Sequence, residues 1–448
     1  MLPERAICFF IILAATLVGV VWGLIVTRRV IEAPFLYAVG MLLILCPQLY
    51  MVAGPHAWRV PTEAYWVFNI MAVLCTVALY LGYFPKPRER VSRKRLGEVW
   101  TIDPKRLYTL GFITAVVGQG AAYKYVSVAN QATRGWPTYW ITLSGFLIPG
   151  ITLMLIAYVH KPTRLRLIPI VLFSYYPMTW IVEGGRRSAT LVLPIIYILP
   201  FLLYKKKFHI PRLAIVGGLV VAFVVAYAFP TWRLAWKEHE YLQSFRDYPL
   251  TEVLANTFSE NTRTPTEIGD GMIVTGARFQ LGNYEYGMSI YNMLVQDFVP
   301  GTLIGYDRKD ALRVGAGVSH DWVQEVYGIP VKFYTAKSGY EDVFSEFSFL
   351  GCIIFYWIGK GFRRAHDAAT LRNDGRAVIF LCFFVSFPAT LAYGSLVFTV
   401  IGTLPTIVYM FLAFRWCLTK QKIEYRLVNP AFVPAVPRFR GVPVRQRV

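Results

Sequence analysis

Two adjacent arginines, Arg186 and Arg187, stand in the segment Glu-Gly-Gly-Arg-Arg-Ser-Ala, directly before a long apolar run. Guanidinium groups bind phosphate oxygens in a two-pronged geometry, and the first turn of a helix adds free backbone N–H groups and a positive dipole end. The pattern therefore predicts a phosphate or pyrophosphate site with Arg187 at its centre. The alternative is that both side chains reach out to lipid headgroups.

Three further cationic residues follow later in the chain and could contact the same substrate. Arg278 stands in Thr-Gly-Ala-Arg-Phe, Lys309 follows the pair Val299-Pro300, and Arg313 comes one helical turn after Lys309. A second guanidinium or ammonium would help to neutralise a diphosphate. The alternative for each residue is an ordinary solvated loop charge.

Two residues are candidates for acid–base chemistry. Glu346 lies about one turn inside a predicted membrane segment, where a carboxylate is costly unless it is paired, so an arginine partner or an acid–base role is expected. His320 could act as a general base near neutral pH, although a structural role is the alternative. The sequence contains no Asp-x-Asp motif and no His/Cys cluster, which predicts neither a metal site nor a cofactor.

The elements that must position these residues are membrane helices. The chain has 448 residues, 56% of them hydrophobic, and its apolar runs are long enough to cross a hydrocarbon core of about 30 Å at about 1.5 Å per residue. Backbone groups in lipid must be satisfied internally, so these runs are expected to be helical. We predict an all-α fold with eleven spans: 6–26, 35–52, 64–84, 107–123, 139–159, 167–182, 188–204, 213–229, 343–358, 377–393 and 397–414.

The placement of basic residues predicts the orientation. Most of the 46 lysines and arginines lie in alternate gaps between the spans, and short basic loops stay on the cytoplasmic side. The N-terminus is then outside and the C-terminus inside. This divides the chain into spans one to eight (1–229), a large outward loop (230–342), spans nine to eleven (343–414) and a basic cytoplasmic tail (415–448).

The outward loop has too many aromatic residues for a disordered segment. Its apolar residues recur at helical spacing over 283–296, which predicts an amphipathic helix lying in the outer membrane interface and ending before Pro300. Trp232 and Trp236, one turn apart, are expected to anchor the preceding span at headgroup level. Chemistry is therefore expected at the outer surface, between this loop and the span ends.

Composition also argues against several classes of protein. The apolar runs do not alternate as the strands of a membrane β-barrel do. The net charge of +20 is explained by membrane topology and contact with anionic lipids, and no nucleic-acid fold signature accompanies it. Ionisable residues are nearly absent from the span centres, which disfavours ion-coupled transport.

This combination resembles the O-antigen polymerase and ligase superfamily. The likeness rests on the many spans, the long late outward loop, the Gly-Arg-Ser turn at Arg187 and the run Ser-Glu-Phe-x-Phe-Leu-Gly around Glu346. It extends over most of the chain in architecture. The resemblance implies an integral-membrane, metal-independent glycosyltransferase of the GT-C type. Its substrates would be undecaprenyl-diphosphate-linked glycans at the outer face of a bacterial inner membrane.

The resemblance also implies roles for individual residues. Arg187 corresponds to the arginine that precedes a span, and Arg278 to a loop arginine; together they would hold the leaving pyrophosphate. Glu346 or His320 would orient or deprotonate the acceptor hydroxyl. Contacts to the rest of the substrate are assigned to three other residues, which are Arg186, Lys309 and Arg313.

We therefore expect a polymerase of lipid-linked oligosaccharide repeat units, making O-antigen or exopolysaccharide. Its expected partners are the lipid-linked glycan, membrane lipids, a chain-length regulator and a flippase, with no nucleic acid. Three alternatives stay open at this point: a ligase-type transfer to another acceptor, a flippase or exporter of the same glycans, and a scaffold for a polysaccharide machine.

Overall fold

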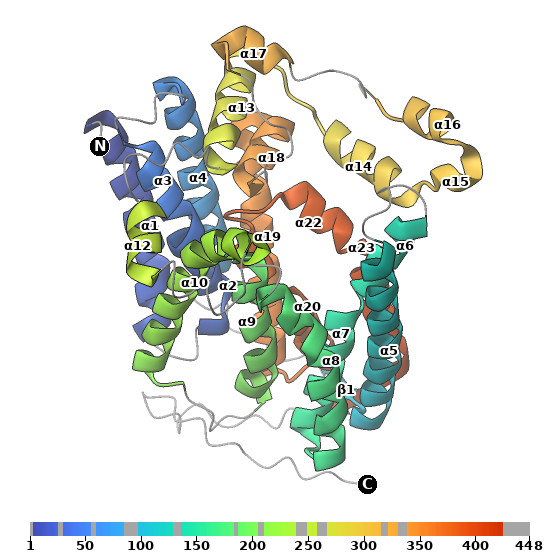
Figure 1. The fold of residues 1–448 in the computed structure, drawn as a ribbon. Helices are drawn as coiled ribbons and strands as arrows, with labels where there is room; N and C mark the ends of the chain where they lie inside the picture. Colours follow the sequence, from blue (N-terminus) through green and yellow to red (C-terminus); the bar gives the residue numbers. More distant parts are fainter. Residues whose placement is uncertain are drawn as a thin grey trace.

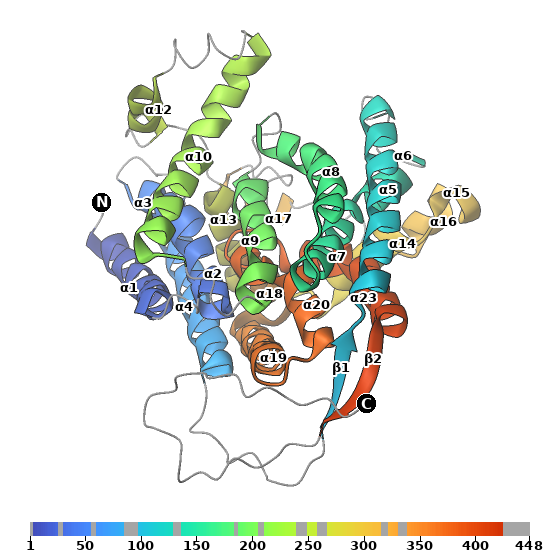
Figure 2. The same ribbon diagram turned by 90° about the horizontal axis from the view of Figure 1, so that it is seen from below.

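In the computed structural model the chain is predominantly α-helical, and helices from its first and last thirds lie side by side (Figure 1, Figure 2). The structure describes residues 3–25, 30–54, 60–84, 97–128, 136–182, 187–204, 210–238, 249–257, 267–314, 321–329 and 338–423. The helices of the first half are α1 (Pro3–Ile25), α2 (Ala33–Gly40), α3 (Cys46–Val52), α4 (Thr62–Tyr83), α5 (Pro104–Val128), α6 (Trp136–Ser144), α7 (Leu147–His160), α8 (Arg164–Val182), α9 (Arg187–Tyr204) and α10 (Arg212–Glu238).

The second half has shorter helices before the last membrane-type segments. They are α12 (Leu250–Thr257), α13 (Glu267–Leu281), α14 (Met288–Phe298), α15 (Gly301–Ile304), α16 (Tyr306–Ala311), α17 (Asp321–Tyr327), α18 (Gly339–Phe347), α19 (Cys352–Leu371), α20 (Gly375–Phe384), α21 (Phe387–Thr390), α22 (Leu396–Gly402) and α23 (Leu404–Cys417).

Six helical segments among the described residues are long and apolar enough to cross a membrane. They are Glu4–Ile25, Ala33–Val52, Thr62–Tyr83, Thr142–His160, Gly339–Leu371 and Thr399–Cys417, and three shorter apolar helices accompany them at Leu193–Tyr204, Arg212–Val224 and Gly375–Thr390. All eleven predicted spans fall on helices, but those at 107–123 and 167–182 belong to neither group. The count of eleven therefore stays a prediction.

The predicted span 35–52 is a single rod with a local distortion. Pro47 has no N–H to donate, and a proline ring clashes with the preceding turn of a helix. The backbone widens just before it into one π-helical segment, Met41–Leu45, and the Cys46 N–H bonds to the Met41 carbonyl. The wider turn lets α2 and α3 continue as one rod, as π-bulges do elsewhere.

Helix α4 lies at the centre of the core and packs against α1, α13 and α19. At its crossing with α19 the two backbones touch: a Cβ atom on Gly82 would overlap the Tyr356 carbonyl oxygen, and one on Gly359 would overlap the Leu79 carbonyl oxygen. Such close approach needs residues without side chains. A buried Tyr37–Tyr340 hydroxyl pair at 2.6 Å, with Thr76 3.0 Å from the Tyr37 hydroxyl, links α2, α4 and α18 nearby.

A two-stranded antiparallel sheet, which was not predicted, accompanies the helices of this predominantly α-helical chain. Strand β1 (Gly97–Ile102) pairs with β2 (Leu418–Ile423), with Gly97 opposite Ile423 and Ile102 opposite Leu418. The prediction had placed both segments in basic loops. Each strand is short and lies beside basic residues, so neither segment stood out as a strand until its distant partner was known.

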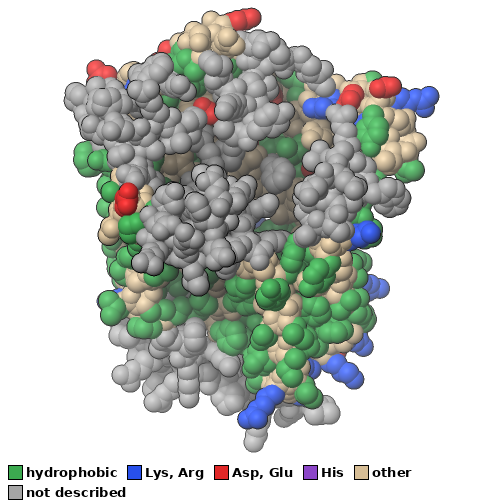
Figure 3. Space-filling model, in the orientation of Figure 1, with side chains coloured by type: hydrophobic (Ala, Val, Ile, Leu, Met, Phe, Trp, Pro, Cys, Tyr) green, Lys and Arg blue, Asp and Glu red, His purple; other side chains and the backbone are tan. Residues whose placement is uncertain are grey.

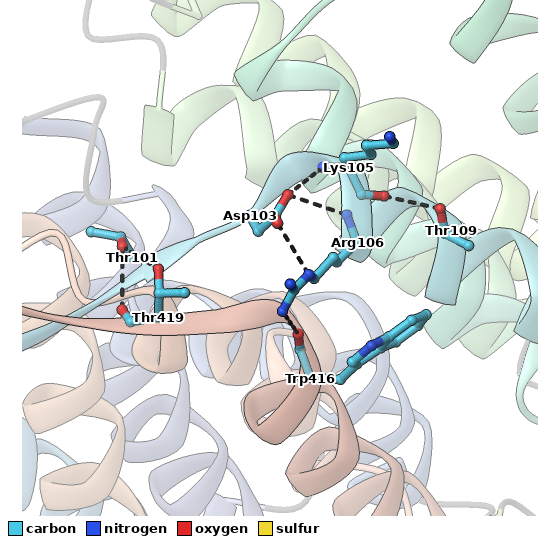
Figure 4. A network of polar contacts seen from close by, with 7 residues as sticks. All are labelled: Thr101, Asp103, Lys105, Arg106, Thr109, Trp416 and Thr419. Carbon is cyan, nitrogen blue, oxygen red and sulfur yellow. Dashed lines mark hydrogen bonds and ion pairs between the residues drawn. The ribbon is translucent and has the colours of Figure 1, made fainter.

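A small polar network holds the start of α5 against the end of α23 (Figure 4). The Asp103 carboxylate accepts the N–H groups of Lys105 at 2.9 Å and Arg106 at 3.3 Å, so it caps the helix. The backbone N–H of Asp103 donates to the Cys417 carbonyl at 2.9 Å, where β2 begins. The sheet and the cap therefore fix α5 to the last helix of the described chain.

Apolar side chains gather over the lower part of the face seen in Figure 3, with Lys and Arg at its bottom edge. Charged side chains of both signs lie at the upper right, over α14 to α16. The apolar surface is large, and among the exposed residues of α1 are Ile7, Phe10 and Val18. A surface of this kind suits contact with lipid rather than water.

The α4–α19 contact leads to a first prediction. Gly359→Ala should lower the thermal stability of the purified protein, because overpacking of a tight interface costs about 1–3 kcal/mol. Gly361→Ala on the same helix is the matched control, since a Cβ atom there would meet nothing within 4 Å. Equal melting temperatures for the two variants in detergent would contradict the contact.

Candidate functional site

The helices that carry the predicted loop arginine and glutamate lie side by side at one end of the molecule (Figure 1). Helix α13 packs against α4, where the Gln280 amide donates to the Glu63 carboxylate at 2.6 Å. At its other end the Ile268 N–H donates to the buried Gln48 side chain at 3.3 Å. Both ends of α13 are thus tied to the core, which fixes the position of Arg278 in its last turn.

Arg278 is buried, with 4% of its surface exposed. Its guanidinium forms an ion pair with Glu285 and donates a hydrogen bond to the Asn283 carbonyl at 3.1 Å. Both partners lie in the turn that follows α13. Arg278 therefore folds this turn back onto the helix, and its charge faces a carboxylate of the same chain.

Glu346 approaches the same turn from α18. The Ser338 hydroxyl caps the start of this helix by accepting the Glu341 N–H at 3.2 Å. The helix ends at Phe347, because Ser348 adopts the left-handed region at φ 53°. Such an end leaves backbone carbonyls without helical partners.

The turn after α13 supplies the missing partners. The Glu285 N–H donates to the Ser345 carbonyl at 2.9 Å, and the Tyr286 N–H donates to the Glu346 carbonyl at 3.1 Å. The Glu346 carboxylate in turn accepts the Gly287 N–H. We call Arg278, Glu285, Gly287 and Glu346 the Glu346 cluster.

The Glu346 side chain is held in a way that leaves one buried oxygen without a hydrogen-bond partner among the described residues. It is 2% exposed, and one carboxylate oxygen is fixed by the Gly287 N–H. The other, Oε1, makes no hydrogen bond among the residues that the structure describes. A carboxylate with one oriented and one unpaired oxygen can accept a proton from a hydroxyl that reaches it, which here requires a local movement because the oxygen is buried.

The predicted amphipathic helix exists, but it begins later than expected. It was predicted over 283–296, whereas α14 spans Met288–Phe298. Tyr286 at φ 46° and Gly287 at φ 92° both lie in the left-handed region, which ends any helical path before residue 288. A bulky residue at positive φ is strained, and such strain is typical of functional turns.

A second candidate site is a cavity at the C-terminal end of α14. A cavity of about 340 Å³ is lined by the end of α14, by α15 and α16 and by α6. We call it the α14 cleft, and its lining residues are Tyr139, Thr142, Gln296, Asp297, Phe298, Val299, Pro300, Gly301, Thr302, Tyr306, Lys309, Asp310 and Arg313. It joins segments about 150 residues apart in the chain.

The structure thus divides the predicted cations into groups. Lys309 and Arg313 line the α14 cleft together, whereas Arg278 belongs to the Glu346 cluster at the other end of α14. Arg187 is the first residue of α9, as expected for an arginine at a helix start, but its side chain is not described. Arg186 and His320 lie outside the described residues.

Several residues at the site were missed by sequence reasoning. Glu285 and Gly287 complete the Glu346 cluster, and the only sequence signal was the pair of glycines, Gly282 and Gly287, that bracket the turn. Asp342 is also buried, and its carboxylate accepts the Ser395 hydroxyl at 2.6 Å and the Val397 N–H at 3.0 Å. It caps α22, which packs against α14.

Within the described ranges, no group of three or more His, Cys, Asp or Glu side chains is arranged to hold a metal ion. Whether the protein works without a metal stays a prediction.

Comparisons with known proteins identify no relative, because no protein family, no curated protein and no solved structure matches the chain. The function must therefore be argued from the site itself.

The pairing of Arg278 with Glu285 leads to a second prediction. Arg278→Ala should destabilise the protein strongly, because it leaves the Glu285 carboxylate partly buried without its ion pair. The double variant Arg278→Ala/Glu285→Ala should recover part of the loss, with a coupling free energy on the order of 1–3 kcal/mol. Additive effects on unfolding in a double-mutant cycle would show that the pair is energetically unimportant.

Proposed function

We propose that the chain is an integral membrane protein with eleven spans, its N-terminus outside and its C-terminus in the cytoplasm. Support comes from the six long apolar helices and the basic residues in alternate gaps. In this topology the segment 230–342 is extracytoplasmic. Both the Glu346 cluster and the α14 cleft then lie at the outer side of a bacterial inner membrane.

The topology gives a third prediction. Reporter fusions after Asp270 and Arg93 should report opposite sides of the membrane, because an outward loop and a basic inward loop carry the two positions. A fusion after Arg212 is a second inward control. The same side for Asp270 and Arg93 would overturn the span count.

We propose further that the protein is a glycosyltransferase that polymerises undecaprenyl-diphosphate-linked repeat units into surface polysaccharide. The observation that carries this proposal is the Glu346 carboxylate, which is buried, oriented by the Gly287 N–H and without a hydrogen-bond partner at Oε1 among the described residues. A carboxylate of this kind is what an acceptor sugar hydroxyl needs for activation.

In the proposed reaction the acceptor hydroxyl gives its proton to Glu346, and its oxygen attacks the anomeric carbon of the donor glycan. The bond from that carbon to the diphosphate oxygen breaks, and the electron pair leaves with the lipid diphosphate. The developing negative charge needs fixed cations. We assign this task to Arg187 with Arg186 beside it, as the turn before α9 predicts. His320 is the alternative acceptor of the proton.

The role of Arg278 follows from its surroundings. Its guanidinium already faces Glu285, and Glu346 adds a second carboxylate nearby, so the cluster carries more negative than positive charge. Such a cluster suits proton transfer from a hydroxyl better than it suits a pyrophosphate. We therefore propose Arg278 as the positioning residue of the turn that orients Glu346, rather than as a direct contact of the leaving group.

The reaction type is the fourth prediction. The full-length protein in nanodiscs, given lipid-diphosphate repeat units, should make a ladder of longer lipid-linked chains, and EDTA should not reduce it. A leaving group stabilised by arginines needs no divalent ion. Transfer of one glycan to a different acceptor without a ladder would indicate a ligase. Movement of intact units across the bilayer without a new glycosidic bond would reject both transferase assignments.

Three variants at two positions, tested in the same assay, separate the two halves of the mechanism. Glu346→Gln keeps the shape of the side chain but not its basicity, so the rate should fall by about 10²- to 10⁴-fold. Arg187→Lys should fail nearly as badly as Arg187→Ala, because a point charge does not replace a fork, with losses of about 10²- to 10³-fold. Wild-type rates in well-expressed Arg187→Ala protein would leave the lipid-headgroup alternative standing.

A further inference from the structure

The α14 cleft lies too far from Glu346 to hold the reacting atoms. The Glu346 carboxylate meets the chain at Gly287, one residue before α14 begins, whereas the cleft surrounds the end of the helix at Asp297 and Phe298. Eleven helical residues correspond to about 16 Å along the axis. A ligand in the cleft must therefore be a more distant part of the substrate, or a separate molecule.

The cleft is held together before any ligand binds. The Asn292 side chain on α14 bridges to Val314, donating to its carbonyl at 2.7 Å and accepting its N–H at 2.9 Å. The Lys309 ammonium donates to the Gln296 carbonyl at 2.5 Å. These contacts fold α16 back onto α14, so the walls of the cleft are preorganised.

The charges in the cleft balance. Lys309 and Arg313 supply two positive charges, and Asp297 and Asp310 supply two negative charges. An oxygen of Asp310 lies 3.8 Å from the Arg313 guanidinium. Partial burial raises the pKa of the Asp297 carboxyl, and the ammonium of Lys309 opposes this rise. An anionic ligand would gain from the cations but would be repelled by both carboxylates.

The rest of the lining combines flat rings with hydrogen-bonding groups. Tyr139, Phe298 and Tyr306 are each partly exposed, at 40%, 46% and 39% of their surface. Around them stand hydroxyl, amide and carboxylate groups from Thr142, Gln296 and the aspartates. Aromatic rings offer apolar area and polar groups offer paired donors and acceptors, which is the chemistry of a hydroxyl-rich ring with an apolar face.

We propose that the α14 cleft binds an uncharged sugar residue of the glycan, several residues away from the reacting end. This inference rests on the proposed function, because it places the glycan of that reaction along α14. Tyr286, just before α14, and Tyr291, on α14, are exposed and would border the glycan between the Glu346 cluster and the α14 cleft. The cleft then selects neutral repeat units over acidic ones and holds the growing chain.

Binding can be measured without the reaction. The full-length protein in nanodiscs is immobilised and exposed to two sets of oligosaccharides of equal length, one of neutral hexoses and N-acetylhexosamines and one containing uronic acids. At least one neutral oligosaccharide should bind more tightly than every uronate-containing one. Tyr306→Ala and Asp310→Ala should each weaken that binding by about tenfold or more, as expected when a ring contact or a hydrogen bond to a charged group is lost.

Matched variants guard against unfolding and general charge effects. Arg308→Gln removes a cation from the same helix, but Arg308 does not line the cleft, so binding should be unchanged. Gly301→Ala would place a Cβ atom 2.7 Å from the Tyr306 ring and 3.3 Å from Lys309, so the ring must shift and binding should weaken. Asp310→Asn leaves one net positive charge and should shift the preference toward uronates.

The outcomes distinguish this inference from the proposed function. Preferential binding of uronates, no binding of any oligosaccharide, or wild-type binding by Tyr306→Ala, Asp310→Ala and Gly301→Ala would overturn the sugar subsite, even if the ladder forms. Neutral binding that depends on the cleft, together with no ladder, would keep the subsite and overturn the polymerase. Both results together support the two proposals.

Discussion

The close contact between α4 and α19 is the constraint on which the rest of the structure depends. At this crossing, glycines let two helix backbones touch, so the relative position of the two helices is set by main-chain atoms rather than by adaptable side chains. Helix α4 also carries α13, and α19 continues from α18 through a short 3₁₀ segment, Ser348–Gly351. Helices α13 and α18, which meet at the Glu346 cluster, are therefore both fixed to α4.

These contacts explain how an irregular turn can hold the Glu346 carboxylate in a fixed position. The carbonyls at the end of α18 and the N–H groups of the turn after α13 satisfy each other, and Arg278 closes the turn from the other side. The turn itself, residues 282–287, contains no helix or strand. The strained Tyr286 sits where these contacts over-determine the backbone, which is the condition under which strain persists.

Sequence reasoning predicted what depends on local pattern and missed what depends on long-range partners. Apolar runs predicted where helices lie, because backbone N–H and C=O groups in lipid must hydrogen-bond within the protein. The start of α14 was wrong by five residues, since the turn before it is shaped by contacts with α18. The β1–β2 pairing was missed for the same reason. Glu346 and Arg278 were named from the sequence, but Glu285 was not, because the contact of its N–H with the Ser345 carbonyl joins positions 60 residues apart and no local pattern indicates it.

The sheet at the opposite end has a consequence for the order of assembly. Strand β1 is synthesised early, but its partner β2 follows about 315 residues later, after every other described helix has been made. Until then the start of α5 lacks both its strand pairing and the Cys417 carbonyl that binds Asp103. The ribbon can close only after β2 has been synthesised, and therefore after all the described helices. The pairing of the two strands joins the early and late parts of the chain after the helices between them have been synthesised.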